Sequence, residues 1–213
     1  MKLIGYFRSS AAFRVRIALN YKGIKVEHAS RHLRKGEQSA PDYVALNPQK
    51  LVPAMVLDSG EVLTQSMAIL EYLEETHPEP PLLPGSAADR ARVRSLALDV
   101  ACEIHPLNNL RVLRYLVKDL GVGDDNKHRW IHHWVESGLA VVEQRLKAER
   151  RSGRFCFGDT PTMADCVLVP QIFNAHRFNS RLDHVPTVMK IFEHCMTLDA
   201  FSKTQPSACP DAE

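Results

Sequence analysis

The chain has 213 residues, of which 45% are hydrophobic and 24% charged, and its formal net charge is +2 at pH 7. These values are typical of a globular protein with room for one large or two modest domains. They argue against a nucleic-acid-binding tail, because no block of lysine and arginine is long enough, and against a membrane span, because no apolar run approaches about 20 residues.

The first residues and the cysteines predict a cytoplasmic protein. The N-terminus leads directly into an apolar run and shows no signal-peptide pattern. Five cysteines, an odd number, are widely spaced along the chain. We therefore expect reduced thiols, with Cys166 and Cys195 as small core residues.

A strand, a tight turn and a helix are expected at the start of the chain. Residues 3–7 have strand character, and helical spacing begins after Ser9 and Ser10 and stops at Gly23. A helix N-terminus offers unpaired N–H groups and a partial positive charge, so this turn suits an anion or a thiolate. Serine hydroxyls there would donate to sulfur, although serine also caps helices without any other role.

The order of elements over the first 80 residues or so predicts a thioredoxin-like domain. After the first helix we expect a strand at residues 24–30, a short helix at 40–46, a hairpin of residues 52–57 and 62–64, and a helix capped by Ser66. The helix between the first two strands implies a parallel crossover. This arrangement places the first helix N-terminus, the Val52-Pro53 turn and Gln65-Ser66 near one edge of the sheet.

The rest of the chain is expected to be helical. Prolines at positions 78, 80, 81 and 84 form a stiff linker, which sets the expected domains at residues 1–82 and 88–213. Helical spacing covers residues 87–120, with a kink at Pro106, and residues 126–150, with Trp130 and Trp134 in the core. Thr162 and Asp165 form a capping box for a third helix, in which Pro170 predicts another kink. A last helix starts at Val185-Pro186.

Motifs along essentially the whole chain resemble those of the cytosolic glutathione transferases, most closely the zeta class of maleylacetoacetate and maleylpyruvate isomerases. The first helix carries Ser9-Ser10-Ala11-Ala12-Phe13-Arg14-Val15-Arg16-Ile17-Ala18-Leu19, where the class has Ser-Ser-Cys-x-Trp-Arg-Val-Arg-Ile-Ala-Leu. Further matches are Ala45-Leu46-Asn47-Pro48, Leu51-Val52-Pro53, Gln65-Ser66, Tyr72-Leu73-Glu74-Glu75, His105-Pro106-Leu107-Asn108-Asn109, Gly158-Asp159, Thr162-Met163-Ala164-Asp165, Val169-Pro170-Gln171 and Asn174-Ala175-His176-Arg177-Phe178. The resemblance implies a thioredoxin-like domain followed by an all-helical domain, glutathione as cofactor, and a homodimer.

One position departs from the class pattern. Ala11 stands where the class has its motif cysteine. Some maleylpyruvate isomerases of this kind also lack that cysteine, so its loss is compatible with isomerisation. It argues against a role for the protein's own sulfur at this position.

The resemblance also implies a set of glutathione-binding residues. Ser9, and with it Ser10, would hydrogen-bond the glutathione sulfur and lower its pKa. The Val52 backbone, exposed by a cis bond to Pro53, would pair with the cysteinyl unit. The γ-glutamyl carboxylate would lie at the helix N-terminus formed by Gln65 and Ser66. His105 and Asn109 are weaker candidates for the same site.

The implied reaction is the glutathione-dependent cis-trans isomerisation of a maleyl keto acid, as in aromatic catabolism. The substrate is a dicarboxylate, and arginine binds carboxylates best because its guanidinium is bidentate. We expect Arg8 and Arg177 to act in substrate binding and catalysis, and Arg111 to be a third substrate-binding residue. The sequence does not choose between maleylacetoacetate and maleylpyruvate.

Two other functions fit the same fold. A general glutathione transferase or dehalogenase acting on small electrophiles is favoured slightly by the loss of the motif cysteine. A non-catalytic interaction module would be expected to lose Ser9 or the Gln65-Ser66 pair, and both are present. His128 and His132 share a helix face, but no third ligand accompanies them, so we expect no metal site, and no nucleic-acid or membrane partner.

Overall fold

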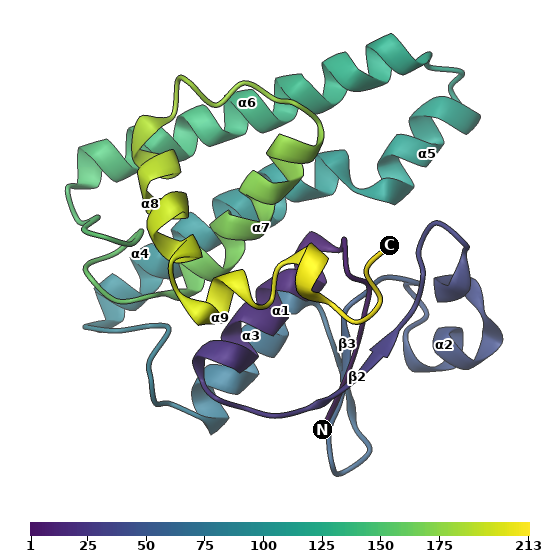
Figure 1. The fold of residues 1–213 in the computed structure, drawn as a ribbon, viewed down its shortest axis with the longest axis horizontal. Helices are drawn as coiled ribbons and strands as arrows, with labels where there is room; N and C mark the ends of the chain where they lie inside the picture. Colours follow the sequence, from purple (N-terminus) through teal and green to yellow (C-terminus); the bar gives the residue numbers. More distant parts are fainter. The chain divides into compact units, whose positions relative to one another are not determined.

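The computed structural model describes all 213 residues and divides into two compact units (Figure 1). The first unit contains Met1–Leu82 together with Thr197–Glu213, and the second contains Leu83–Met196. The sequence placed residues 197–213 with the helices. They belong to the first unit instead, because this segment returns to the sheet and bonds to residues at its edge.

The first unit is built on a four-stranded sheet in the order β2-β1-β3-β4. Its strands are β1 (Lys2–Gly5), β2 (Glu27–Ser30), β3 (Ala54–Val56) and β4 (Val62–Thr64). β1 runs parallel to β2 and antiparallel to β3, and β3 runs antiparallel to β4. The expected thioredoxin-like order is confirmed, although β2 starts three residues later than the apolar run suggested, at Glu27 rather than Ile24.

Helices cover both faces of this sheet. α1 (Ser10–Tyr21) and α3 (Ser66–Thr76) pack together, and α2 (Pro41–Leu46) is a separate short helix. Ile4 on β1 packs with Tyr43 of α2, whereas a Cβ added at Gly5 would lie 3.2 Å from the Cβ of Ala12 in α1. Because side chains alternate along a strand, α1 and α2 lie on opposite faces. At Gly5, therefore, α1 lies close enough to β1 to leave little room for a side chain.

The second unit is helical. Its helices are α4 (Ala87–Leu98), α5 (Leu110–Lys118), α6 (Asp124–Glu149), α7 (Met163–Arg177) and α8 (Pro186–Met196). Between α4 and α5 lie a π-helical segment, η2 (Asp99–Ile104), and a 3₁₀ segment, η3 (His105–Asn108). The sequence predicted one helical run with a kink at Pro106, whereas the α-helix is interrupted from Asp99 to Asn109. None of the helices is long and apolar enough to cross a membrane.

α7 forms the centre of this unit and packs against α4, η2 and α8. All residues from Met163 to Ile172 are buried, and the assigned helix continues through Pro170. At its N-terminus, Asp165 accepts hydrogen bonds from the N–H of Thr162 at 2.8 Å and from its hydroxyl at 2.7 Å. This confirms the predicted capping box. Trp130 and Trp134 are only half-buried, so the prediction that they lie in the core was wrong.

Three short elements complete the first unit. A 3₁₀ turn, η1 (Glu37–Ser39), precedes α2. α9 (Asp199–Ser202) packs against α1 and leads into η4 (Pro206–Ala208) near the C-terminus.

Candidate functional site

Strand register brings three chain segments to one edge of the first unit. Ile4 of β1 pairs with Ala54 of β3, and Ala54 pairs with Thr64 of β4. The residues just after Ile4, just before Ala54 and just after Thr64 therefore leave the sheet side by side. These are the segments that carry Ser9, Val52 and Gln65, as the sequence predicted.

Ser9 is the N-cap of α1. Its backbone is extended (φ −71°, ψ 114°), its Oγ accepts from the N–H of Ala12 at 3.2 Å, and its own N–H donates to the carbonyl of Tyr6 at 2.9 Å. The hydroxyl oxygen is used as an acceptor, so its proton remains for a further acceptor. Ser9 is half-buried, whereas Ser10 is the first residue of α1 and only 8% exposed. Ser9 is thus the more accessible of the two hydroxyls.

Hydrogen bonds from α2 and its C-cap residue fix the residue that precedes the Val52-Pro53 turn. Its peptide bond is cis, as expected. The hydroxyl of Tyr43 and the side-chain N–H of Asn47 both donate to the carbonyl of Leu51, at 2.6 and 2.8 Å. Burial raises the pKa of Tyr43 to about 12, against the hydrogen bond with Asn47 and the charge of Arg31, so its hydroxyl stays a donor at neutral pH. Val52 itself precedes the first ladder residue of β3.

Gln65, not Ser66, occupies the cap position of α3. Gln65 has φ 67° and ψ 115°, and Ser66 is already helical. The prediction that Ser66 is the cap was therefore wrong by one residue. A residue other than glycine is strained at positive φ, and residues strained in this way are common at functional sites. The exposed Gln65 side chain donates from Nε2 to Oε1 of Gln49 at 2.9 Å.

A buried cation lies behind the start of α3. Nη1 of Arg14, on α1, donates to Oγ of Ser66 at 3.1 Å, and the two residues are 2% and 5% exposed. The sequence predicted no separate role for Arg14, which appears only within the motif of the first helix. A signal was present, because Arg14 stands between the apolar residues Phe13 and Val15, which are buried, and a buried charge needs a partner.

The predicted arginines lie in both units. In the first unit, Arg8 is half-buried and its guanidinium carbon lies 4.9 Å from the ring centroid of Phe7. In the second unit, Arg177 ends α7, is exposed, and stacks 4.4 Å from the ring centroid of Phe178.

The remaining predicted residues belong to the second unit. Asn109 caps α5, because its side chain accepts from the N–H of Arg111 at 3.1 Å. His105 begins η3, and the side chain of Arg111 is exposed.

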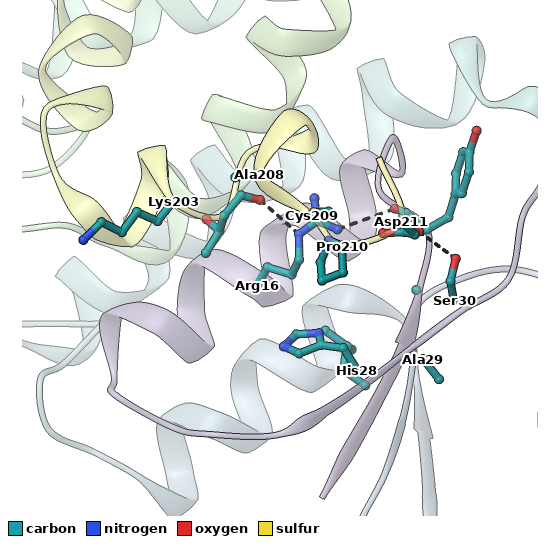
Figure 2. A pocket seen from close by; sticks show the side chains of 13 residues that line it. Arg16, His28, Ala29, Ser30, Lys203, Ala208, Cys209, Pro210 and Asp211 are labelled. Atoms are coloured by element: carbon teal, nitrogen blue, oxygen red, sulfur yellow. Dashed lines mark hydrogen bonds between the residues drawn. The ribbon is translucent and has the colours of Figure 1, made fainter. Parts of the chain in front are cut away.

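A cavity of about 190 Å³ also lies in the first unit, but on the other flank of β1 (Figure 2). Residues of β2 and of the C-terminal segment line it, including His28, Ser30, Cys209 and Asp211. Because β2 and β3 lie on opposite sides of β1, this cavity lies away from the Val52-Pro53 turn, although Tyr6, in the turn that leads to Ser9, lines it. All five cysteines of the chain, Cys209 among them, are free.

Comparison with known proteins identifies the family of the chain. Residues 1–75 match the glutathione S-transferase N-terminal domain, and residues 135–193 match the glutathione S-transferase C-terminal domain. The chain belongs to the glutathione S-transferase family. Within the family its structural neighbours are zeta-class transferases, which confirms the class expected from the motifs.

Three similar glutathione S-transferase family proteins cover the whole chain. A maleylpyruvate isomerase from Ralstonia sp. is 46% identical over 213 residues, which is 100% of each chain. The holo structure of a bacterial zeta-class maleylpyruvate isomerase has a TM-score of 0.97 at 45% identity, covering 100% of both chains. A maleylacetoacetate isomerase from Methylobacterium extorquens AM1, solved with malonate and glutathione bound, has a TM-score of 0.97 at 43% identity and the same coverage.

Proposed function

We propose that this glutathione S-transferase is a glutathione-dependent cis-trans isomerase of a maleyl keto acid, maleylpyruvate or maleylacetoacetate. The observation that carries the proposal is the convergence of three turns at one sheet edge: Ser9 at the α1 N-terminus, the cis Val52-Pro53 turn, and the α3 N-terminus with Arg14 behind it. The names of the similar proteins support the same reaction.

The donor set at this edge fits glutathione. The main chain of Val52, held in place through Leu51, would pair with the cysteinyl unit of the peptide. The N–H groups at the start of α3 and the hydroxyl of Ser66 would bind the γ-glutamyl carboxylate. Because the Ser66 oxygen accepts from Arg14, its proton is directed to another acceptor, and the guanidinium charge makes it a better donor. Gln65 would contribute from the same turn.

When bound, glutathione would supply a thiolate nucleophile for reversible addition to the cis double bond, which permits isomerisation without consumption of the thiol. The hydroxyl proton of Ser9 and the N-terminal end of α1 would stabilise the sulfur anion. We assign this role to Ser9 rather than to Ser10, because the Ser9 hydroxyl is the accessible cap.

The substrate's carboxylates require cations. We propose Arg8, together with Arg177 and Arg111, for this task, with His105 and Asn109 as secondary glutathione-binding candidates. Malonate in the Methylobacterium extorquens structure supports a dicarboxylate ligand for proteins of this kind. Positive charge close to the reacting atoms would also stabilise the negative charge that develops on the substrate oxygen.

Isomerisation rates with purified protein test the proposal. Maleylpyruvate and maleylacetoacetate are each supplied with and without glutathione, and free thiol is measured over many turnovers. We expect turnover only with glutathione, with no loss of thiol. Isomerisation that proceeds equally without glutathione, or turnover that consumes the thiol, would contradict the proposal. The second outcome would favour a transferase or dehalogenase. The presence of Ala11 in place of the motif cysteine slightly favours that alternative.

We further propose a cytoplasmic homodimer that acts in aromatic catabolism. Five free cysteines suit a reducing compartment. Light scattering of the purified protein tests the dimer, and a mass near 24.0 kDa, that of one chain, would contradict it.

A further inference from the structure

Both main-chain polar groups of Phe7, two positions before Ser9, form hydrogen bonds with side chains. The N–H of Phe7 donates to Oδ2 of Asp211 at 3.1 Å, and the carbonyl of Phe7 accepts from Nη2 of Arg16 at 3.1 Å. Asp211 comes from the C-terminal segment, 204 positions along the chain, and Arg16 from the second half of α1. Figure 2 shows the side chains of Arg16 and Asp211 close to each other, with Asp211 on the C-terminal segment.

Arg16 ties the turn before α1 to the C-terminal segment. It is only 8% exposed, its Nε donates to the carbonyl of Thr204 at 3.0 Å, and its Nη1 lies 3.5 Å from the carbonyl of Tyr6. The Tyr6 carbonyl also accepts from the N–H of Ser9. One buried guanidinium therefore bonds to the carbonyls of both Tyr6 and Phe7, in the turn that leads to Ser9. Burial lowers the pKa of Arg16, while Cys209 and Asp211 act in the opposite direction.

Asp211 is itself held in place. Its Oδ2 accepts from the hydroxyl of Ser30 at 2.6 Å, at the end of β2. Two residues later, Glu213 pairs with Nε2 of His32 at 2.9 Å and with Nζ of Lys35 at 3.5 Å. Asp211 and Glu213 thus both attach the C-terminal segment to the rest of the first unit. Of these two residues, only Asp211 forms a hydrogen bond with the turn that carries Ser9.

We propose that Asp211, acting with Arg16, is a positioning residue for Ser9. By fixing the amide and carbonyl of Phe7, the pair sets the path of the turn and hence the location of the Ser9 hydroxyl. The inference rests on the proposed function, in which that hydroxyl stabilises the glutathione thiolate. Placement matters because an error of about 1 Å in a catalytic group can reduce the rate about 100-fold.

A purely structural role for the C-terminal segment makes a different prediction. In that case the segment only covers the adjacent cavity, and loss of Asp211 would lower stability without changing the chemistry of a bound thiol. The test therefore needs readouts of position and of thiol ionisation in addition to stability.

The full-length variants Asp211→Ala and Asp211→Asn are compared with Glu213→Gln, a matched control on the same segment that does not bond to the turn. Amide hydrogen exchange of Phe7 and Ser9 is measured first, without any ligand. The thiolate absorbance of bound glutathione is then titrated, and kcat and KM for glutathione are determined.

We expect Asp211→Ala to speed exchange at Phe7 about tenfold or more, because a hydrogen bond to a charged acceptor is lost. The pKa of bound glutathione should rise and kcat should fall several-fold, with KM less affected. Asp211→Asn should lie between Asp211→Ala and wild type, which keeps the test available if the alanine variant does not fold. Glu213→Gln should match wild type throughout.

Two results would overturn the inference: unchanged Phe7 exchange in both Asp211 variants, or faster exchange with an unchanged thiol pKa. Failure of the wild-type protein to bind glutathione would instead contradict the proposed function. Exchange at Phe7 reports on the turn in either case, so the two failures are distinguishable.

Discussion

The guanidinium of Arg14 donates from Nη1 to the hydroxyl oxygen of Ser66 at 3.1 Å, linking the interior of α1 to the first residue of α3. Both side chains are almost completely buried. The bond stabilises the packing of the two helices and leaves the Ser66 hydroxyl proton for an acceptor at the helix N-terminus. A single contact therefore serves both the fold and the candidate site.

Removing the Ser66 hydroxyl should weaken glutathione binding. Ser66→Ala deletes one donor to the γ-glutamyl carboxylate, so we expect Kd to rise about tenfold, as for a hydrogen bond to a charged group. Calorimetric titration measures the change. Ser59→Ala, in the exposed hairpin turn, is the matched control and should bind as wild type does. Equal affinities for the two variants would remove Ser66 from the site.

Replacing Ser9 should act on the thiol rather than on binding. In Ser9→Ala the sulfur anion loses its hydroxyl donor, so the pKa of bound glutathione should rise by about 1 unit or more and kcat should fall. The cap of α1 is also lost, at a cost of about 1 kcal/mol. Ser9→Thr keeps a hydroxyl and should recover much of both effects. Titration of the thiolate absorbance makes the comparison, and an equal effect of Ser10→Ala would contradict the choice of Ser9.

Gln65 offers a test of backbone strain. Gln65→Gly removes the strain of φ 67°, about 1 to 3 kcal/mol, but adds freedom to the unfolded chain. We expect the free energy of unfolding to stay within about 1 kcal/mol of wild type while glutathione affinity falls. Urea denaturation and calorimetric titration check the two parts. Affinity that is unchanged in this variant would show that the Gln65 side chain takes no part in binding.

A buried ion pair holds the end of α3. Nζ of Lys22 donates to Oε2 of Glu74 at 2.9 Å, and the two side chains are 0% and 4% exposed. Lys22→Met would leave the carboxylate buried without this partner, so the free energy of unfolding should fall by about 3 to 5 kcal/mol. Lys25→Met, at an exposed position nearby, should change it by less than about 0.5 kcal/mol. Urea denaturation measures both variants. Equal denaturation midpoints for Lys22→Met and Lys25→Met would show that the buried ion pair does not stabilise the fold.

Periodicity and turn chemistry predicted the order of elements, the parallel crossover of β1 and β2, the β3–β4 hairpin and the Thr162–Asp165 capping box. The cis Val52-Pro53 bond was instead implied by the resemblance to the family. The capping box is local, and the crossover and the hairpin join elements that follow one another closely along the chain. The convergence of Ser9, Val52 and Gln65 then follows from strand register alone.

Features that depend on distant contacts were not predicted. Asp211 bonds to a turn 204 positions away, and no local pattern near the C-terminus indicates it. The cap of α3 was assigned to Ser66 because serine is a common cap, whereas Ser66 is already helical and its hydroxyl accepts from Arg14, 52 positions earlier in the chain. The half-burial of Trp130 and Trp134 likewise depends on which neighbours cover α6, and helical spacing does not report this.

A carboxylate on α6 predicts the pH dependence of stability in the second unit. Glu143 is 3% exposed and accepts from the N–H groups of Thr187 and Val188, at 3.1 and 2.9 Å, at the start of α8. Burial acts to raise its pKa, but the bonds from Lys147, Val188 and Thr187 outweigh burial and lower it. The contribution of Glu143 to stability is therefore present above the unfolded pKa of about 4.3 and is lost as pH falls through the lower folded value.

Glu143→Gln should remove this contribution. At pH 7 we expect the free energy of unfolding to fall by about 1 to 3 kcal/mol, because charge-assisted bonds to two helix N–H groups are weakened. The difference from wild type should shrink as pH falls below the unfolded pKa of about 4.3, because proton uptake by the carboxyl then favours the unfolded wild-type chain. Urea denaturation at pH 7, 5 and 3.5 measures it. Glu149→Gln, on the same helix in a more exposed pair with Arg145, should change stability by less than about 1 kcal/mol. A difference between Glu143→Gln and wild type that stays constant with pH would show that the carboxylate's charge does not stabilise α8.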